Sequence, residues 1–226
     1  MYWSAIAAAL LLLARVESRD SATLLRRAGA FVDPRTNGGS MLDNAGSGGG
    51  EPLNVIISGH SSAQVLTDAG IINFARAIGF STECFGIHLG DPQSANLGDG
   101  NGPQNQTIEL RQDYGDPIAG TCLESLIGGN HFRVFRQNGP LAPTGALFLA
   151  VSQEESVAES HTISPDGYNL GRINLVANAT GIKSFGGVTY SSVVENTVGL
   201  LPVGADGINH GIAIDGIVAV MTVTAT

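Results

Sequence analysis

Residues 131–136 (HFRVFR) and 145–151 (GALFLAV) decide the fold of this chain. Both runs are rich in aromatic and branched apolar side chains, and both have the length of a strand. The residues that join them include Asn138-Gly139-Pro140, a combination typical of a turn. The two runs therefore predict a β-hairpin.

Side-chain alternation divides the first of these strands into two faces. His131 and Arg133 fall on one face with Phe135, while Phe132 and Val134 fall on the other. The first face is therefore expected to carry a histidine and an arginine next to an aromatic side chain.

The remaining regular structure is predicted from hydrophobic periodicity on either side of this hairpin. We expect strands at residues 53–58, 84–89, 188–194, 210–214 and 217–224, and helices at about 62–78 and 168–179. Asp215-Gly216 is a hairpin turn signal between the last two strands. The strand, helix, strand order at the start favours a parallel pair. The chain is thus expected to be α/β or α+β, a single domain with a mixed sheet, about two main helices and a β-rich carboxy-terminal part.

The amino-acid composition argues against several classes of protein. The length of 226 residues fits one domain, and 14% charged residues with 31 glycines argue against a coiled coil or helical bundle. Eleven Lys and Arg against 20 Asp and Glu give a formal net charge of −9. A protein that binds the phosphate backbone needs the opposite sign, so nucleic acid is not expected as a partner.

The amino-terminal residues indicate secretion. Residues 1–14 carry no charge and include an apolar run that is too short to span a bilayer, which predicts a signal peptide at 1–18 and no membrane span. Residues 19–50 have little periodicity and end in a Gly/Ser-rich stretch, so a disordered arm or linker is expected there. Arg26-Arg27 within it is a candidate dibasic processing site, the alternative being an uncut arm. The folded domain is expected at 51–226.

The cysteines and sequons agree with an extracellular location. Cys84 and Cys122 predict a disulfide bond, the alternative being two buried free thiols. Asn105 and Asn178 each begin an Asn-x-Ser/Thr sequon without proline and are candidate glycosylation sites.

One polar constellation could carry chemistry. His131 and Arg133 on the first strand, the acidic pair Glu154-Glu155, His161 and Arg172 are concentrated in a chain that is poor in charge. Two histidines beside arginines could act as an acid/base pair with a clamp for an anionic substrate. His131, Arg133 and His161 are therefore the candidate catalytic residues. In the alternative interpretation, these side chains form structural ion pairs inside the fold.

Other segments give weaker indications. Residues 90–106, rich in Gly and Pro, predict a long surface loop that could contact a glycan or protein partner. The oxygen side chains of 91–101 could bind calcium, with a solvated turn as the alternative. His60, His88 and His210 lie in three separate segments, so no spacing supports a metal site, and no cofactor is expected.

Several of these motifs resemble the LssY carboxy-terminal domain family. The similarity rests on residues 52–59, 131–135, 161–166 and 214–218, and the same order of elements runs over about 52–224. As a whole, the sequence is also similar to small secreted fungal proteins without assigned function. The activity of the LssY domain is not established, so the resemblance implies the domain boundaries rather than a mechanism.

Two functional hypotheses follow from the sequence. The favoured one is a non-catalytic extracellular surface or binding protein that uses loop 90–106. The other is a hydrolase, directed at a phosphoester, that uses His131 and His161. The two hypotheses predict different distances between the imidazoles, because an acid and a base must both reach one reacting group.

Overall fold

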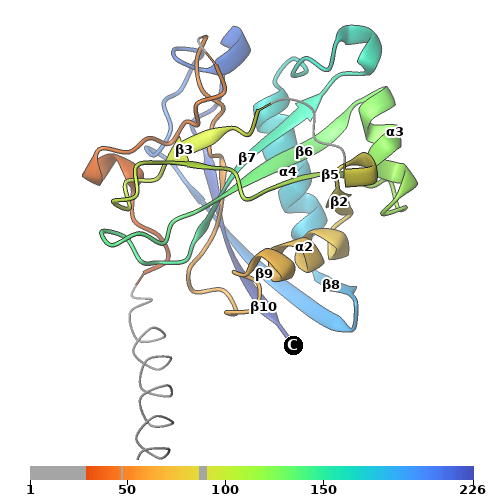
Figure 1. Cartoon of the computed structure of the whole chain (residues 1–226), viewed down its shortest axis with the longest axis horizontal. Helices are drawn as coiled ribbons and strands as arrows, with labels where there is room; N and C mark the ends of the chain where they lie inside the picture. Colours follow the sequence, from red (N-terminus) through yellow and green to blue (C-terminus); the bar gives the residue numbers. More distant parts are fainter. Residues whose placement is uncertain (1–28, 47, 87–90) are drawn as a thin grey trace, which may run out of the picture.

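The computed structural model describes residues 29–46, 48–86 and 91–226 (Figure 1). The α-helices in this part of the chain are α2 (Asp68–Ala77), α3 (Ala119–Ile127) and α4 (Gly167–Ala179). The large sheet contains β1 (Val55–Ile57), β2 (Phe80–Thr82), β5 (Ile108–Gln112), β6 (Gly129–Arg136), β7 (Leu147–Glu154), β8 (Ile182–Phe185), β9 (Val188–Thr197) and β10 (Val218–Ala225). A small sheet contains β3 (Ser94–Asn96) and β4 (Pro103–Asn105). The expected mixed α/β fold is confirmed.

The large sheet has the order β2-β5-β6-β7-β1-β10-β9-β8. The predicted hairpin is confirmed as β6 and β7, which pair Phe132 with Val151. β1 lies in the middle of the sheet, antiparallel to β7 and parallel to β10, and Ile56 is aligned with Phe148 on one side and Val220 on the other. The parallel β1–β10 pair joins segments near the two ends of the described chain.

The start of the fold differs from the expected parallel pair. α2 begins after Thr67, whose side chain accepts a hydrogen bond from Gly70 N, and the chain turns at Gly79 with φ of 87°. β2 therefore begins at Phe80 and pairs antiparallel with β5 at the sheet edge. The strand expected at 84–89 is wrong for its first part, because 84–86 form the 3-10 helix η2 (Cys84–Gly86), while 87–90 lie outside the described residues.

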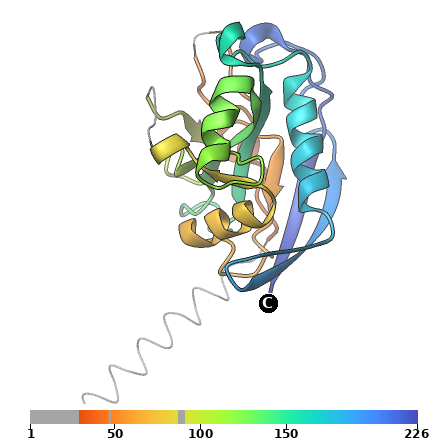
Figure 2. The same ribbon diagram turned by 90° about the vertical axis from the view of Figure 1, so that its right-hand side faces the viewer.

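Helices α2 and α4 cover one face of the sheet (Figures 1 and 2). The core on this face contains Phe74 of α2, Leu175 of α4, and Phe132 of β6, each 1% exposed. The helix expected at 168–179 is confirmed as α4, which follows Asp166. Its buried residues are spaced for one face, but the apolar residues Leu170 and Ile173 lie outside that face and are 40% and 52% exposed, so apolar periodicity predicted the helix and not its buried side.

The opposite face is covered by α3 over β5 and β6, and by irregular chain over its apolar part. Apolar side chains of the sheet, such as Ile56, Phe135 and Phe148, pack there against Met41 of the amino-terminal arm and Leu201. The described residues before β1 therefore do not form the disordered arm expected at 19–50.

Two contacts fix that arm to the rest of the structure. The Gln137 side chain accepts a hydrogen bond from Val32 N and donates one to Val32 O, while Ser40 N donates to Asn96 O. The arm is ordered because it completes the second core, which the composition of the arm does not reveal.

Three further predictions also change. Residues 90–106, expected to lack structure, contain the β3–β4 hairpin. Residues 210–214 were expected to form a strand, but the 3-10 helix η4 (Asn209–Gly211) lies there. The hairpin turn expected at Asp215-Gly216 is wrong as well, since β10 pairs with β9. The Asp215 carboxylate instead forms a bidentate ion pair with Arg172 at 2.7 Å.

The expected disulfide is confirmed: Cys84 and Cys122 are bonded, with their Cα atoms 4.7 Å apart. The bond attaches α3 to η2. Within the described ranges, no helix combines the length and the apolar character needed to cross a membrane.

Candidate metal centre

A cluster of charged side chains occupies the half of the second sheet face that lies on β5, β6 and β7. Strand register brings the cluster together, because Arg111, His131 and Ser152 are cross-strand neighbours, and Glu109 pairs with Arg133. Glu154 ends β7 on the same face. Helix α3 adds Glu124, whose side chain is fully buried.

Arg111 lies at the centre of this cluster. Its Nη1 donates to Glu124 and Glu154, both at 3.1 Å, and its Nη2 donates to Glu109 Oε1 at 2.7 Å. Its Nε also lies 3.9 Å from Glu83 Oε1. One guanidinium therefore neutralises only part of the charge of four neighbouring carboxyl groups.

Arg133 does not act as a free clamp for an anionic substrate. Its Nη1 donates to Glu51 Oε2 at 2.6 Å, and its Nε lies 3.3 Å from Glu109 Oε2. Glu51 N in turn donates to Asp43 Oδ1 at 2.7 Å, which extends the cluster to the amino-terminal arm. The arginine that the sequence singled out therefore sits in structural ion pairs.

The cluster contains more acids than permanent cations. Among the residues that the structure describes, two arginines face six carboxyl groups, namely Asp43, Glu51, Glu83, Glu109, Glu124 and Glu154. Burial raises the pKa of Glu124 to about 7 against the opposing effect of Arg111, and burial also raises the pKa of Asp43 to about 7. A buried excess of negative charge is relieved either by bound protons or by a bound cation.

The His131 imidazole is fully buried within this negative environment. Its Nε2 lies 3.3 Å from Ser152 Oγ, while its Nδ1 lies 3.5 Å from Glu154 Oε1 and has no hydrogen-bond partner. Burial lowers the pKa of His131 well below 6.5, and the charges of Arg133 and Arg111 lower it further. This direction favours the neutral imidazole, the state that binds metal ions.

His161 approaches the same carboxylate from a loop. Its backbone has a φ of 52°, which turns the chain back towards β7. Its Nδ1 lies 3.7 Å from Glu154 Oε2 and also lacks a hydrogen-bond partner, and its side chain is 34% exposed. The two histidines predicted from the sequence are thus brought to the two oxygens of one carboxylate.

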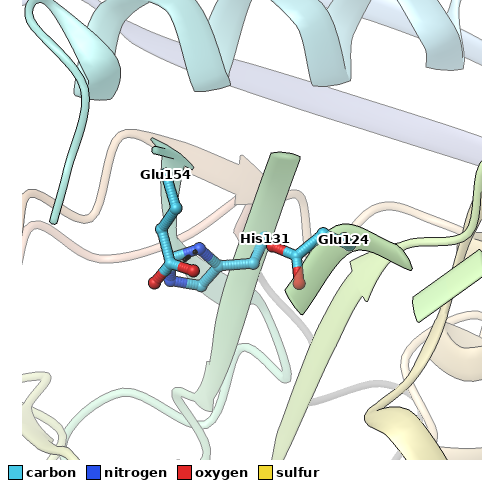
Figure 3. Close-up of side chains that lie close together, drawn as sticks. All are labelled: Glu124, His131 and Glu154. Carbon is cyan, nitrogen blue, oxygen red and sulfur yellow. Dashed lines mark ion pairs between the residues drawn. The ribbon is translucent and has the colours of Figure 1, made fainter. Parts of the chain in front are cut away.

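The donor atoms have spacings compatible with a metal ion. Glu124, His131 and Glu154 each offer one ligand atom within 4.8 Å of the others, and Figure 3 shows the His131 ring beside Glu154, with Glu124 on its other side. Tetrahedral ligands at 2.0–2.2 Å from zinc lie about 3.4 Å apart. The 3.5 and 3.7 Å separations between imidazole and carboxylate are near that value.

Other residues singled out from the sequence lie elsewhere. Arg172 is paired with Asp215. Asp99, in the segment considered for calcium, is buried and accepts hydrogen bonds from the backbone N–H groups of Asn101, Asn138 and Gly139, so the protein itself uses its oxygens. The described histidines His60 and His210 are both exposed and are not members of the centre, and His88 lies outside the described residues.

The sequon asparagines are both accessible. Asn105 lies on β4 and Asn178 lies near the end of α4, and both are exposed. Glycosylation at these positions stays a prediction.

Sequence reasoning missed Glu124 and Arg111. The signal for Glu124 is that it is the single charged residue of a helical segment otherwise made of apolar and small residues, 119–127. A lone acid in such a segment indicates a buried partner. The signal for Arg111 is its alternation with Glu109 on a strand.

Comparison with known proteins gives no match: no family model, no curated protein and no solved structure matches the chain. The resemblance to LssY carboxy-terminal domains therefore stays a prediction.

Proposed function

We propose that this protein is an extracellular binding protein whose ligand is a divalent metal ion of the zinc type. The ion would be held by His131, Glu154 and Glu124, with His161 as a further ligand. The observation that carries the proposal is the pair of imidazole Nδ1 atoms that face one carboxylate without hydrogen bonds.

The chemistry of the donors supports a first-row transition ion over calcium. Imidazole nitrogen suits zinc and its neighbours, whereas calcium takes six to eight oxygen ligands. A neutral His131 provides a nitrogen lone pair, and the carboxylates provide the negative charge that a dication neutralises. Arg111 holds Glu154 through Oε2, which leaves Oε1 facing His131.

The test is zinc binding by the full-length protein after removal of metal with a chelator. Calorimetric titration with Zn²⁺ at pH 7.5 should give one site, and substitution by Co²⁺ should give the visible absorption of a four-coordinate ion. His161→Ala should weaken Zn²⁺ binding at least tenfold, and His131→Ala should abolish it. His60→Ala and His210→Ala are matched controls and should bind as the wild type does.

Since His131 is fully buried, its substitution could disturb folding, whereas His161 is partly exposed. His161→Ala with an unchanged circular dichroism spectrum is therefore the decisive variant. Unaltered zinc affinity in that variant, or the absence of a site in the wild type, would overturn the proposal.

The exposure of His161 favours a second candidate function, a hydrolase directed at phosphoesters. An ion that is open to solvent on one side can polarise a substrate or activate water. His161, on the solvent-exposed side of the site, would then donate or accept a proton during hydrolysis. The buried His131 would serve as a metal ligand. Zinc-dependent hydrolysis of p-nitrophenyl phosphate that His161→Ala removes and His60→Ala retains would support the hydrolase over a binding protein.

A further inference from the structure

Helix α3 presents its apolar residues outward. All nine of its residues are described, and the buried ones are Gly120, Thr121 and Glu124, while Leu123, Leu126 and Ile127 are 41%, 59% and 54% exposed. A helix at a protein surface normally buries its apolar side and exposes its charges. The orientation of α3 is reversed, so its leucines and isoleucine have no role in the core of the monomer.

Neighbouring segments extend this apolar surface. Ile118, which precedes the helix, is 70% exposed, and Val157 of the 3-10 helix η3 (Val157–Glu159), which packs against α3, is 53% exposed. Phe85 is 78% exposed and stands next to Cys84, whose disulfide bond reaches α3. We call these six residues the α3 patch: Phe85, Ile118, Leu123, Leu126, Ile127 and Val157.

The backbone holds Phe85 outward at an unfavourable conformation. Its φ is 52°, in the left-handed region that bulky side chains rarely adopt. Conformations of this kind are kept where the surroundings determine them, and they cluster at functional positions. The disulfide bond between Cys84 and Cys122 attaches η2 to α3, so the backbone of Phe85 is held next to the helix.

We propose that the α3 patch is the contact surface of a homodimer, in which α3 packs against α3 of a second copy. The patch exposes on the order of 600 Å² of apolar surface, at the upper limit for the largest patch of a typical monomer. Two copies would bury about 1,200 Å² in total, the lower end of specific protein interfaces. An interface of this size fits a small dimer contact, whose affinity depends on packing rather than on area alone.

The charge of α3 itself permits contact with a second copy. The chain has a net charge of −9, so two copies can meet only where few acids face each other, and the single charge of α3, Glu124, points inward. A basic partner would find the exposed carboxylates of Asp116 and Glu159 beside the patch but none on the exposed side of α3. A bilayer would find none of the Lys, Arg or Trp residues that anchor proteins at lipid headgroups within the patch.

The geometry is self-complementary. Residues 123, 126 and 127 have the i, i+3, i+4 spacing with which one helix packs against another. A twofold axis through this face would place the apolar residues of one α3 against the same residues of the other α3, as in most homodimers. Figure 2 shows α3 in front, with no other segment covering it.

The test is sedimentation of the full-length protein between 1 and 200 μM. The wild type should show a monomer–dimer equilibrium, and Leu126→Glu or Ile127→Glu should weaken it at least tenfold, since each places a charge in the contact. Val203→Glu, at a position that is 80% exposed outside the patch, is the matched control and should dimerise as the wild type does.

A wild type that stays monomeric at 200 μM would overturn the proposal. Flotation of that monomer with phosphatidylcholine vesicles, lost in Leu126→Glu, would instead identify a lipid surface as the occupant. Unchanged dimerisation in both patch variants would place the interface elsewhere and would also overturn it. The dimer does not depend on the metal, so zinc binding need not change in these variants.

Discussion

Replacement of Asp43 by asparagine should stabilise the protein at neutral and alkaline pH. Asp43 is 3% exposed, its Oδ2 has no hydrogen-bond partner, and its neighbours include Glu51, Arg133 and Tyr168. Burial, followed by the negative charge of Glu51, raises the pKa of Asp43 from 3.8 to about 7. Ionisation of this side chain is therefore unfavourable in the folded protein.

The sign and size of the effect follow from linkage. The folded protein keeps a proton on Asp43 that the unfolded chain releases above about pH 4, so this group's contribution to stability falls as the pH rises from about 4 to 7. A rise in pKa from 3.8 to about 7 is worth about 4 kcal/mol, since a tenfold change in an equilibrium constant is worth about 1.4 kcal/mol. The asparagine side chain stays neutral at every pH, so Asp43→Asn should be about 2–4 kcal/mol more stable than the wild type at pH 8 and nearly equal to it at pH 4.

The assay is chemical unfolding with the disulfide intact and a chelator present, at several values between pH 4 and 8. Glu51 and Glu124 also have raised pKa values, and the difference between variant and wild type reports Asp43 together with its electrostatic interaction with Glu51. Asp91→Asn, on an exposed residue, is the control and should change stability by less than about 0.5 kcal/mol. A difference that does not vary with pH, or an Asp43→Asn protein less stable at pH 8, would refute the reasoning.

Three further outcomes are expected. Leu175→Ala should lower the free energy of unfolding by about 2–5 kcal/mol, because this side chain is 1% exposed between α4 and the sheet, as denaturant titration will measure. Replacing Cys84 and Cys122 together by serine should lower it by about 4 kcal/mol, the loop-closure value for a separation of 38 residues, while alkylation of the denatured wild-type protein should find no free thiol. Protein secreted by a eukaryotic host should carry glycans at Asn105 and Asn178, seen as a mass loss on deglycosylation, whereas an unchanged mass would contradict this.

Local sequence patterns predicted the individual strands and helices better than they predicted which strands pair with each other. Alternation correctly placed His131 and Arg133 on one face, because the pleat of a strand is a property of a few consecutive residues. The partner of β1 was not predictable in this way, since β10 lies far along the chain and both strands have similar apolar sequences. Pairing between distant strands depends on the whole set of competing registers.

The candidate site was predicted only in part for a related reason. His131 and His161 are recognisable by residue type, but their convergence on Glu154 depends on a loop with left-handed residues. Helix α3 was missed because its apolar residues face outward and its acid faces inward, the reverse of the pattern that sequence reasoning assumes. Glu124 was therefore missed together with its helix.

The parallel pairing of β1 with β10 also sets when the chain can fold. Val55 is aligned with Ala219 and Ile57 with Met221, so the middle of the sheet lacks one of its strands until β10, at residues 218–225, has been synthesised. Contacts between segments so far apart carry a large loop-closure entropy, and folds that depend on them form slowly. A nascent chain in which β10 is still inside the ribosome would leave one side of β1 unpaired. Folding of the large sheet is therefore expected to be completed only after β10 has left the ribosome.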